Sequence, residues 1–160
     1  MLGPDNAIWD DSEWVSWDDI NRQLQYKEWR AKYPNANRPL IPVFENLLSV
    51  AEHYHDVTGS HLQVYGDIGE LFAAITHGVT LHRNYTPGSD GRMGRDFIEV
   101  KTITPFKNRD VVEVKVSGNF NKLFVVKINA KFEIAGKMID RKSLPAPRAG
   151  KFKIAWSQIE

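Results

Sequence analysis

The chain has 160 residues, which suits one domain with a single core, and its composition of 42% hydrophobic and 26% charged residues is ordinary for a soluble protein. It has no cysteine, which excludes a disulfide framework, a cysteine-ligated zinc site and a thiol nucleophile. Net charge is +1, but residues 1–60 hold 10 acidic and 5 basic side chains, whereas residues 61–160 hold 10 acidic and 16 basic. The basic second half is compatible with a polyanionic ligand, although chance asymmetry of a solvated surface is the simpler explanation.

The sequence contains no apolar run long enough to cross a bilayer. Its first residues, MLGPDNAIWDDSEW, are acidic, whereas a secretory signal begins with basic residues followed by an apolar stretch. We therefore expect a cytoplasmic protein with no membrane association.

Residues 1–40 are expected to form an acidic, tryptophan-rich arm followed by a helix. Ser16 can cap that helix, with Asp19 three residues later in the capping-box position, and the helix should stop before Pro34. Residues 34–42, with three prolines and two asparagines, predict a loop. Three tryptophans are dense for a free tail, so we expect the arm to pack onto the domain or onto a second copy; they are Trp9, Trp14 and Trp17.

Two further helices follow in the predicted core, residues 41–160. Apolar residues at helical spacing predict a helix from about Val43 to Gly59, and another over residues 67–77, ended by Gly78. In the third helix, Glu70 lies on a face of small residues, opposite the bulky one. Two interpretations are almost equally good: Glu70 is drawn inward toward another element, or it is a first-turn glutamate favoured by the helix dipole.

The rest of the sequence predicts a sheet. Strands are expected at residues 79–86, 97–104, 111–117, 123–129 and 152–156. Residues 87–96 read as a turn-rich connection, and residues 137–153 as a basic loop with prolines. Residues 117–122 are short enough to join their neighbouring strands as an antiparallel hairpin. The expected fold class is α/β (α+β), with a mixed central sheet flanked by helices.

The strand at residues 97–104 carries the chemically informative residues. Side chains alternate along a strand, so Glu99 and Lys101 share one face. Apolar residues occur on both faces, which predicts a central, covered strand. A charge within the protein is costly unless it is paired or bound to a metal, so these two residues call for an explanation.

Asp90 supplies that explanation. It stands nine residues before Glu99, across a glycine-rich turn, so pairing of the two strands would bring both carboxylates together. A divalent cation relieves their repulsion, and the adjacent Lys101 can hold a water or balance charge on a phosphate oxygen. This is the equipment for metal-assisted phosphodiester hydrolysis.

The pattern of Asp90 followed by Glu99-Val100-Lys101 resembles the PD-(D/E)XK nuclease superfamily, which includes type II restriction enzymes and Holliday-junction resolvases, over roughly residues 66–130. The resemblance implies a restriction-endonuclease-like core, DNA as substrate and Mg²⁺ (or Mn²⁺) as cofactor. It implies metal ligands at Asp90, Glu99 and the backbone carbonyl of Val100. It also implies that Lys101 is the catalytic lysine and that Glu70 orients Lys101 or helps to bind a second metal.

The sequence departs from the family pattern in two ways. Ser89 stands where the motif name has proline, and residues 104–111 are short for a crossover helix. A second Glu-x-Lys, Glu113-Val114-Lys115, serves as a control. It reads as a half-exposed amphipathic strand, with no aspartate-bearing turn at the right distance before it.

Contacts to nucleic acid are expected from basic side chains around this site. Arginine and lysine match phosphate groups, and the candidates are Arg92, Arg95, Lys107, Arg109, Arg141 and Lys142. The predicted function is a magnesium-dependent endodeoxyribonuclease, endonuclease or resolvase-like, and family analogy suggests a homodimer. The alternatives are a nuclease fold that binds nucleic acid or protein without cutting, and an interaction protein that uses the tryptophan-rich arm.

Overall fold

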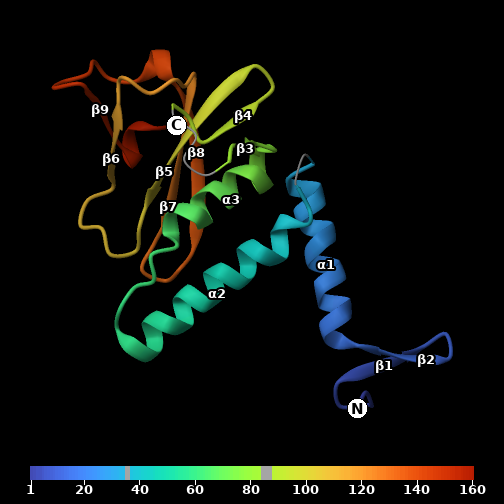
Figure 1. Ribbon diagram of the computed structural model, residues 1–160. Coiled ribbons are helices and arrows are strands. Elements are labelled where there is room, and N and C mark those ends of the chain that lie inside the picture. Colours follow the sequence, from blue (N-terminus) through green and yellow to red (C-terminus); the bar gives the residue numbers. More distant parts are fainter. Residues whose placement is uncertain (35–36, 84–87) are drawn as a thin grey trace. The chain divides into compact units, whose positions relative to one another are not determined.

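The computed structural model describes residues 1–34, 37–83 and 88–160. Two compact units make up the chain, residues 1–36 and residues 37–160 (Figure 1). The boundary lies in the proline-containing segment that the sequence analysis assigned to a loop. Within the described ranges, no helix is long and apolar enough to span a membrane.

The first unit begins with a hairpin, in the segment that the sequence analysis described as an acidic, tryptophan-rich arm without assigning strands to it. Strands β1 (Ala7–Asp10) and β2 (Glu13–Ser16) pair in antiparallel fashion. Their two-residue turn, Asp11 and Ser12, has φ values of 42° and 71°, which match the twist of paired strands. Helix α1 (Trp17–Lys32) follows directly, and the backbone N–H of Asp19 donates to Ser16 Oγ at 3.1 Å, which confirms the predicted cap.

In the second unit, helix α2 spans Leu40–Thr58 and helix α3 spans Tyr65–His77. Their ends at Gly59 and Gly78 confirm the prediction. The predicted loop over residues 34–42 is wrong at its end, because α2 starts at Leu40 and includes Pro42. Proline is tolerated in the first turn of a helix, where its missing N–H would have no partner in any case.

The main sheet has five strands in the order β3-β4-β5-β7-β8. They are β3 (Thr80–Leu81), β4 (Gly91–Met93), β5 (Asp96–Ile103), β7 (Lys122–Ile128) and β8 (Ile134–Asp140). Only β5 and β7 run parallel, so the sheet is mixed and the coarse α+β class is confirmed. The central place of β5, between β4 and β7, is also confirmed.

Several predicted boundaries in the sheet are wrong. The connection at residues 87–96 contains β4, and the supposed basic loop at residues 137–153 contains the end of β8. In the described part of the strand predicted at residues 79–86, only Thr80 and Leu81 form a strand, β3, and residues 84–87 lie outside the described residues.

The predicted hairpin through residues 117–122 is also wrong. Strand β6 (Val111–Lys115) pairs with β9 (Lys151–Ala155) in a separate two-stranded sheet, and β7 lies parallel to β5. The parallel strands β5 and β7 cannot be joined by a tight turn, because the chain must first return to the end of the sheet at which β5 began. Here β6 forms part of that return, in place of a crossover helix.

The two faces of the main sheet are covered differently (Figure 1). Helix α3 packs on one face, where the Phe72 and Phe124 rings stack with centroids 6.2 Å apart, and α2 packs against α3. Strands β6 and β9 cover the other face through a buried cluster that includes Val112, Leu123 and Phe152. The prediction of flanking helices therefore holds for one face only.

Close packing of α3 against β5 depends on Gly69. A Cβ atom built on Gly69 would lie 2.0 Å from Oγ1 of Thr102, so the helix can rest on the strand only where the side chain is missing. This contact sets the position of Glu70, the next residue of the helix.

We predict that Gly69→Ala lowers the free energy of unfolding by about 1–3 kcal/mol, because the new methyl group must push α3 away from β5. Urea titration would measure the change. Gly66→Ala is the matched control, since an added Cβ there meets nothing within 4 Å. Adding Thr102→Ala should restore part of the loss; equal stability of the two glycine variants would contradict the contact.

Candidate active site

Asp90 lies where the pairing of β4 with β5 stops. Its backbone N–H donates to the carbonyl of Ile98 at 2.9 Å, and Oδ2 of its carboxylate accepts from the backbone N–H of Val100 at 2.7 Å. The carboxylate thus takes the place of the missing ladder bond and is fixed against the centre of β5. The structure thereby brings Asp90 beside Glu99, as the sequence pattern suggested.

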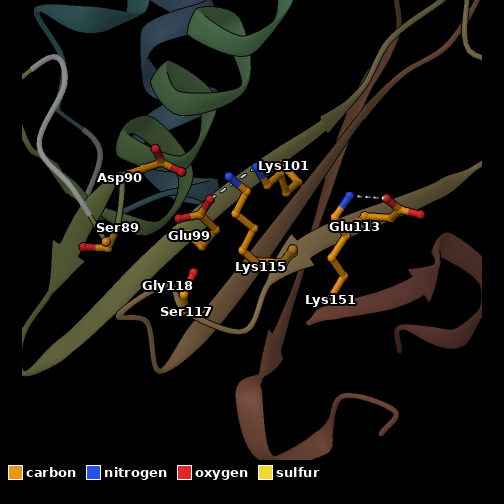
Figure 2. A pocket seen from close by; sticks show the side chains of 11 residues that line it. Ser89, Asp90, Glu99, Lys101, Glu113, Lys115, Ser117, Gly118 and Lys151 are labelled. Carbon is orange, nitrogen blue, oxygen red and sulfur yellow. Dashed lines mark ion pairs between the residues drawn. The ribbon is translucent and has the colours of Figure 1, made fainter. Parts of the chain in front are cut away.

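Glu99 and Lys101 project from β5 on the face that is covered by β6, opposite the face that Thr102 presents to α3. Nζ of Lys101 lies 3.3 Å from Oε1 of Glu99 (Figure 2). The glutamate side chain is 17% exposed and the lysine side chain 40% exposed. The pair is therefore partly withdrawn from water but still open on one side.

Glu70 is partly buried, and the structure decides between its two interpretations. Helix α3 begins at Tyr65, so Glu70 lies beyond the first turn and is not held there by the helix dipole. Burial raises the pKa of Glu70 to about 7, with further contributions from the negative charges of Asp90, Asp67 and Glu99. Glu70 therefore belongs to the electrostatic surroundings of the Asp90–Glu99 pair.

The pKa of Glu99 is raised as well. Burial is the largest cause and the charge of Asp90 is the next, while Lys101 acts in the opposite direction. A cluster in which carboxylates raise one another's pKa gains stability from a proton or a cation. Within residues 1–34, 37–83 and 88–160, however, no group of three or more histidine, aspartate or glutamate side chains forms a ready-made metal site.

Asp90, Glu99 and Lys101 border an open pocket of about 580 Å³, whereas Glu70 is not among its lining residues. Its other walls come from the segment before β4 and from β6, β9 and the turn after β6 (Figure 2). The lining residues are Gly88, Ser89, Asp90, Glu99, Lys101, Glu113, Val114, Lys115, Ser117, Gly118 and Lys151. The second Glu-x-Lys is a strand with buried valines and exposed charges, as predicted, yet it faces the first across this pocket.

None of the six basic residues predicted to contact nucleic acid lines this pocket. Arg92, Arg95, Lys107 and Arg109 are exposed elsewhere, with Nε of Arg92 donating to the carbonyl of Gly94 and Nζ of Lys107 to that of Val111. Lys142 and Arg141 border a different hollow beside β8. The site residues that the sequence analysis missed are Lys115 and Lys151.

Arg141 has a structural task. Its guanidinium donates to the carbonyls of Val116 and Gly118, both at 2.6 Å, and to that of Phe120 at 3.3 Å. Asn119, the next residue of that turn, is also held in place, because its backbone N–H donates to the carbonyl of Gly88 at 2.7 Å. Arg141 thus holds the turn that forms one wall of the pocket.

No protein-family model matches the sequence, and a search of curated proteins found no match.

We predict that Glu70→Gln stabilises the protein above neutral pH. A carboxyl group with a raised folded-state pKa contributes stability below its unfolded value near 4.5, and this contribution is lost as pH rises through about 7. The variant should exceed the wild type by about 1–2 kcal/mol at pH 8, less than the full shift implies because burial is partial. The difference should shrink toward pH 5. Glu52→Gln, an exposed glutamate of α2, is the control for urea titrations at both pH values.

Proposed function

We propose that this chain is a metal-dependent nuclease that hydrolyses DNA phosphodiester bonds at the pocket formed by Asp90, Glu99 and Lys101. One observation carries the proposal: the carboxylates of Asp90 and Glu99 lie beside Lys101 in an open pocket, and the charge of Asp90 contributes to the raised pKa values of Glu99 and of Glu70, which lies outside the pocket lining. Carboxylates that raise one another's pKa are unfavourable for folding, so their presence favours a functional explanation.

The residues fit a magnesium or manganese ion. Oδ2 of Asp90 is used by the N–H of Val100, and Oδ1 has no hydrogen bond within the part of the chain that the structure describes. The carbonyl of a strand residue points to the same edge as its N–H, so the carbonyl of Val100 is directed toward Asp90. Asp90, Glu99 and this carbonyl would hold the ion. Mg²⁺ commonly takes one or two carboxylates and completes its shell with water and substrate phosphate, so a third carboxylate is not required.

Bound metal supplies a Lewis acid and lowers the pKa of a water molecule. Lys101 supports this chemistry by placing an ammonium beside Glu99, where it can donate to a phosphate oxygen as negative charge develops. Glu70, with a pKa of about 7, can exchange a proton near neutral pH. The charges that act on Glu70 are those of carboxylates, and Lys101 pairs with Glu99, so we assign Glu70 to the metal side of the site.

The fold supports a restriction-endonuclease-like core in part. A helix with a glutamate precedes the antiparallel pair β4 and β5, Asp90 stands directly before β4 and Glu99 lies on β5, and β5 has a parallel neighbour in β7. The return between these parallel strands runs through β6, where such a core would place a helix. We therefore propose that the chain is a variant of this core.

We predict metal-dependent cleavage of DNA by the wild type and a loss of at least about 100-fold in Lys101→Ala and Asp90→Ala. Supercoiled plasmid, linear duplex, single strands and a branched junction would each be incubated with Mg²⁺, Mn²⁺ or EDTA. Lys131→Ala, an exposed lysine in the turn after β7, is the matched control. If the folded wild type cuts none of these substrates and binds no metal, the non-catalytic binding module becomes the better proposal.

Metal binding can be tested without activity. We predict that millimolar Mn²⁺ raises the Tm of the wild type, because the ion binds only the folded site. The increase should be larger at pH 8 than at pH 5, where Glu70 and Glu99 are more often protonated. Asp90→Asn should abolish the increase, whereas Glu113→Gln should retain it; an equal increase in both variants would place the metal elsewhere.

A further inference from the structure

The outer face of the β6–β9 hairpin carries an unusual pairing of charges. Lys115 lies directly opposite Lys151, and Glu113 lies opposite Lys153. The other face of the hairpin is apolar and buried. Like charges directly across a strand pair are destabilising, so the lysine pair is not explained by the stability of the hairpin.

Two of the charged side chains that line the pocket are not in an ion pair with another pocket residue. Lys101 pairs with Glu99 at 3.3 Å, and Lys151 pairs with Glu113 at 3.6 Å. Asp90 and Lys115 have no ion-pair partner within the part of the chain that the structure describes. The two have opposite charges, so the pocket can bind a cation at Asp90, before β4, and an anion at Lys115, on β6.

Figure 2 shows where the second of these groups points. Lys115 extends from β6 into the pocket, toward Glu99 and Lys101 on β5. An anion held between β5 and β6 would therefore meet the ammonium groups of Lys101 and Lys115. A phosphate that also touches a metal ion on Asp90 is such an anion, since phosphate oxygens are shared readily between Mg²⁺ and lysine.

The positive surface continues away from Asp90. A second hollow of about 660 Å³ shares Glu113 and Lys151 with the pocket and is lined further along by Arg148 and Lys153. Residues two apart on a strand lie about 7 Å apart on the same face, so Lys151 and Lys153 form a row. A row of cations that leads from one anion site fits a ligand with repeated negative charges.

We propose that the outer face of the β6–β9 hairpin binds the sugar–phosphate backbone of the nucleic acid next to the bond that is cut, with Lys115 as the contact nearest to the centre. This inference rests on the proposed function, which it extends by naming a backbone-binding surface. An acidic protein fits less well, because its carboxylates would add to the repulsion around Asp90 and Glu99 with no group to bridge them.

The test measures binding separately from cleavage. Fluorescence anisotropy with a labelled DNA duplex, in Ca²⁺ instead of Mg²⁺, would give affinities over a series of salt concentrations. We expect Lys115→Ala to weaken binding roughly three- to tenfold and to reduce the slope of log K against log salt by about 1. Lys115→Arg should keep most of the affinity. Lys131→Ala is the control, a lysine of the β7–β8 turn.

Outcomes for this surface and for the proposed function can be told apart. If the wild type cuts DNA and Lys115→Ala binds as the control does, the backbone surface is overturned and the nuclease proposal stands. If the variant loses affinity and salt slope while the wild type cuts nothing, the surface is supported and the nuclease proposal fails. If Lys115→Ala binds poly-glutamate more weakly than the wild type does, but binds DNA equally well, the backbone surface is overturned in favour of an acidic protein partner.

Discussion

The Asp90 carboxylate on the N–H of Val100 is the interaction on which the site depends. Val100 is 8% exposed, and β4 begins only at Gly91, so the backbone N–H of Val100 would be buried without a partner if no side chain reached it. An unmade hydrogen bond of this kind costs about 1–3 kcal/mol. Asp90 removes that cost and is thereby held beside Glu99. The need to satisfy the N–H of Val100 thus fixes the Asp90 carboxylate through Oδ2 and leaves Oδ1 available to a ligand.

Helix α3 adds to this arrangement from the other side of β5. Because Gly69 allows the helix to rest on Thr102, Glu70 comes close enough to Asp90 and Glu99 for their charges to raise its pKa. The same closeness makes the cluster of carboxylates electrostatically unfavourable. The packing of α3 on the sheet, which includes the Phe72–Phe124 contact, therefore holds these carboxylates close together against their mutual repulsion.

Local pattern was enough to predict what depends on nearby residues. The Ser16 cap, the helix ends at Gly59 and Gly78, and the central place of β5 follow from side-chain chemistry and alternation within a few positions. The nearness of Asp90 to Glu99 followed from a short turn in the same way. Strand β8 was missed because the loop interpretation gave more weight to the charges and prolines after Lys137 than to its apolar residues.

Partners that are distant in sequence were beyond the reach of such patterns. Strand β6 was assigned to its neighbour in sequence, although its partner is β9, far along the chain. That mistake also hid Lys115, because the second Glu-x-Lys enters the pocket only if β6 crosses the face of β5. Its amphipathic alternation was read correctly and its location was not.

The sequence also could not show which basic residues are engaged by the protein itself and which are available to a ligand. The sequence alone does not tell which of Arg141 and Lys115 has a structural role. In the structure, the guanidinium of Arg141 donates to three backbone carbonyls, whereas the ammonium of Lys115 has no carboxylate partner among the described residues. The two are connected through the turn after β6. By holding the carbonyls of Val116 and Gly118, Arg141 fixes the segment that follows directly on Lys115 and forms the adjoining wall. A planar, multidentate cation is suited to organising backbone, and a flexible ammonium to meeting a ligand, so the division of labour between them follows from their chemistry.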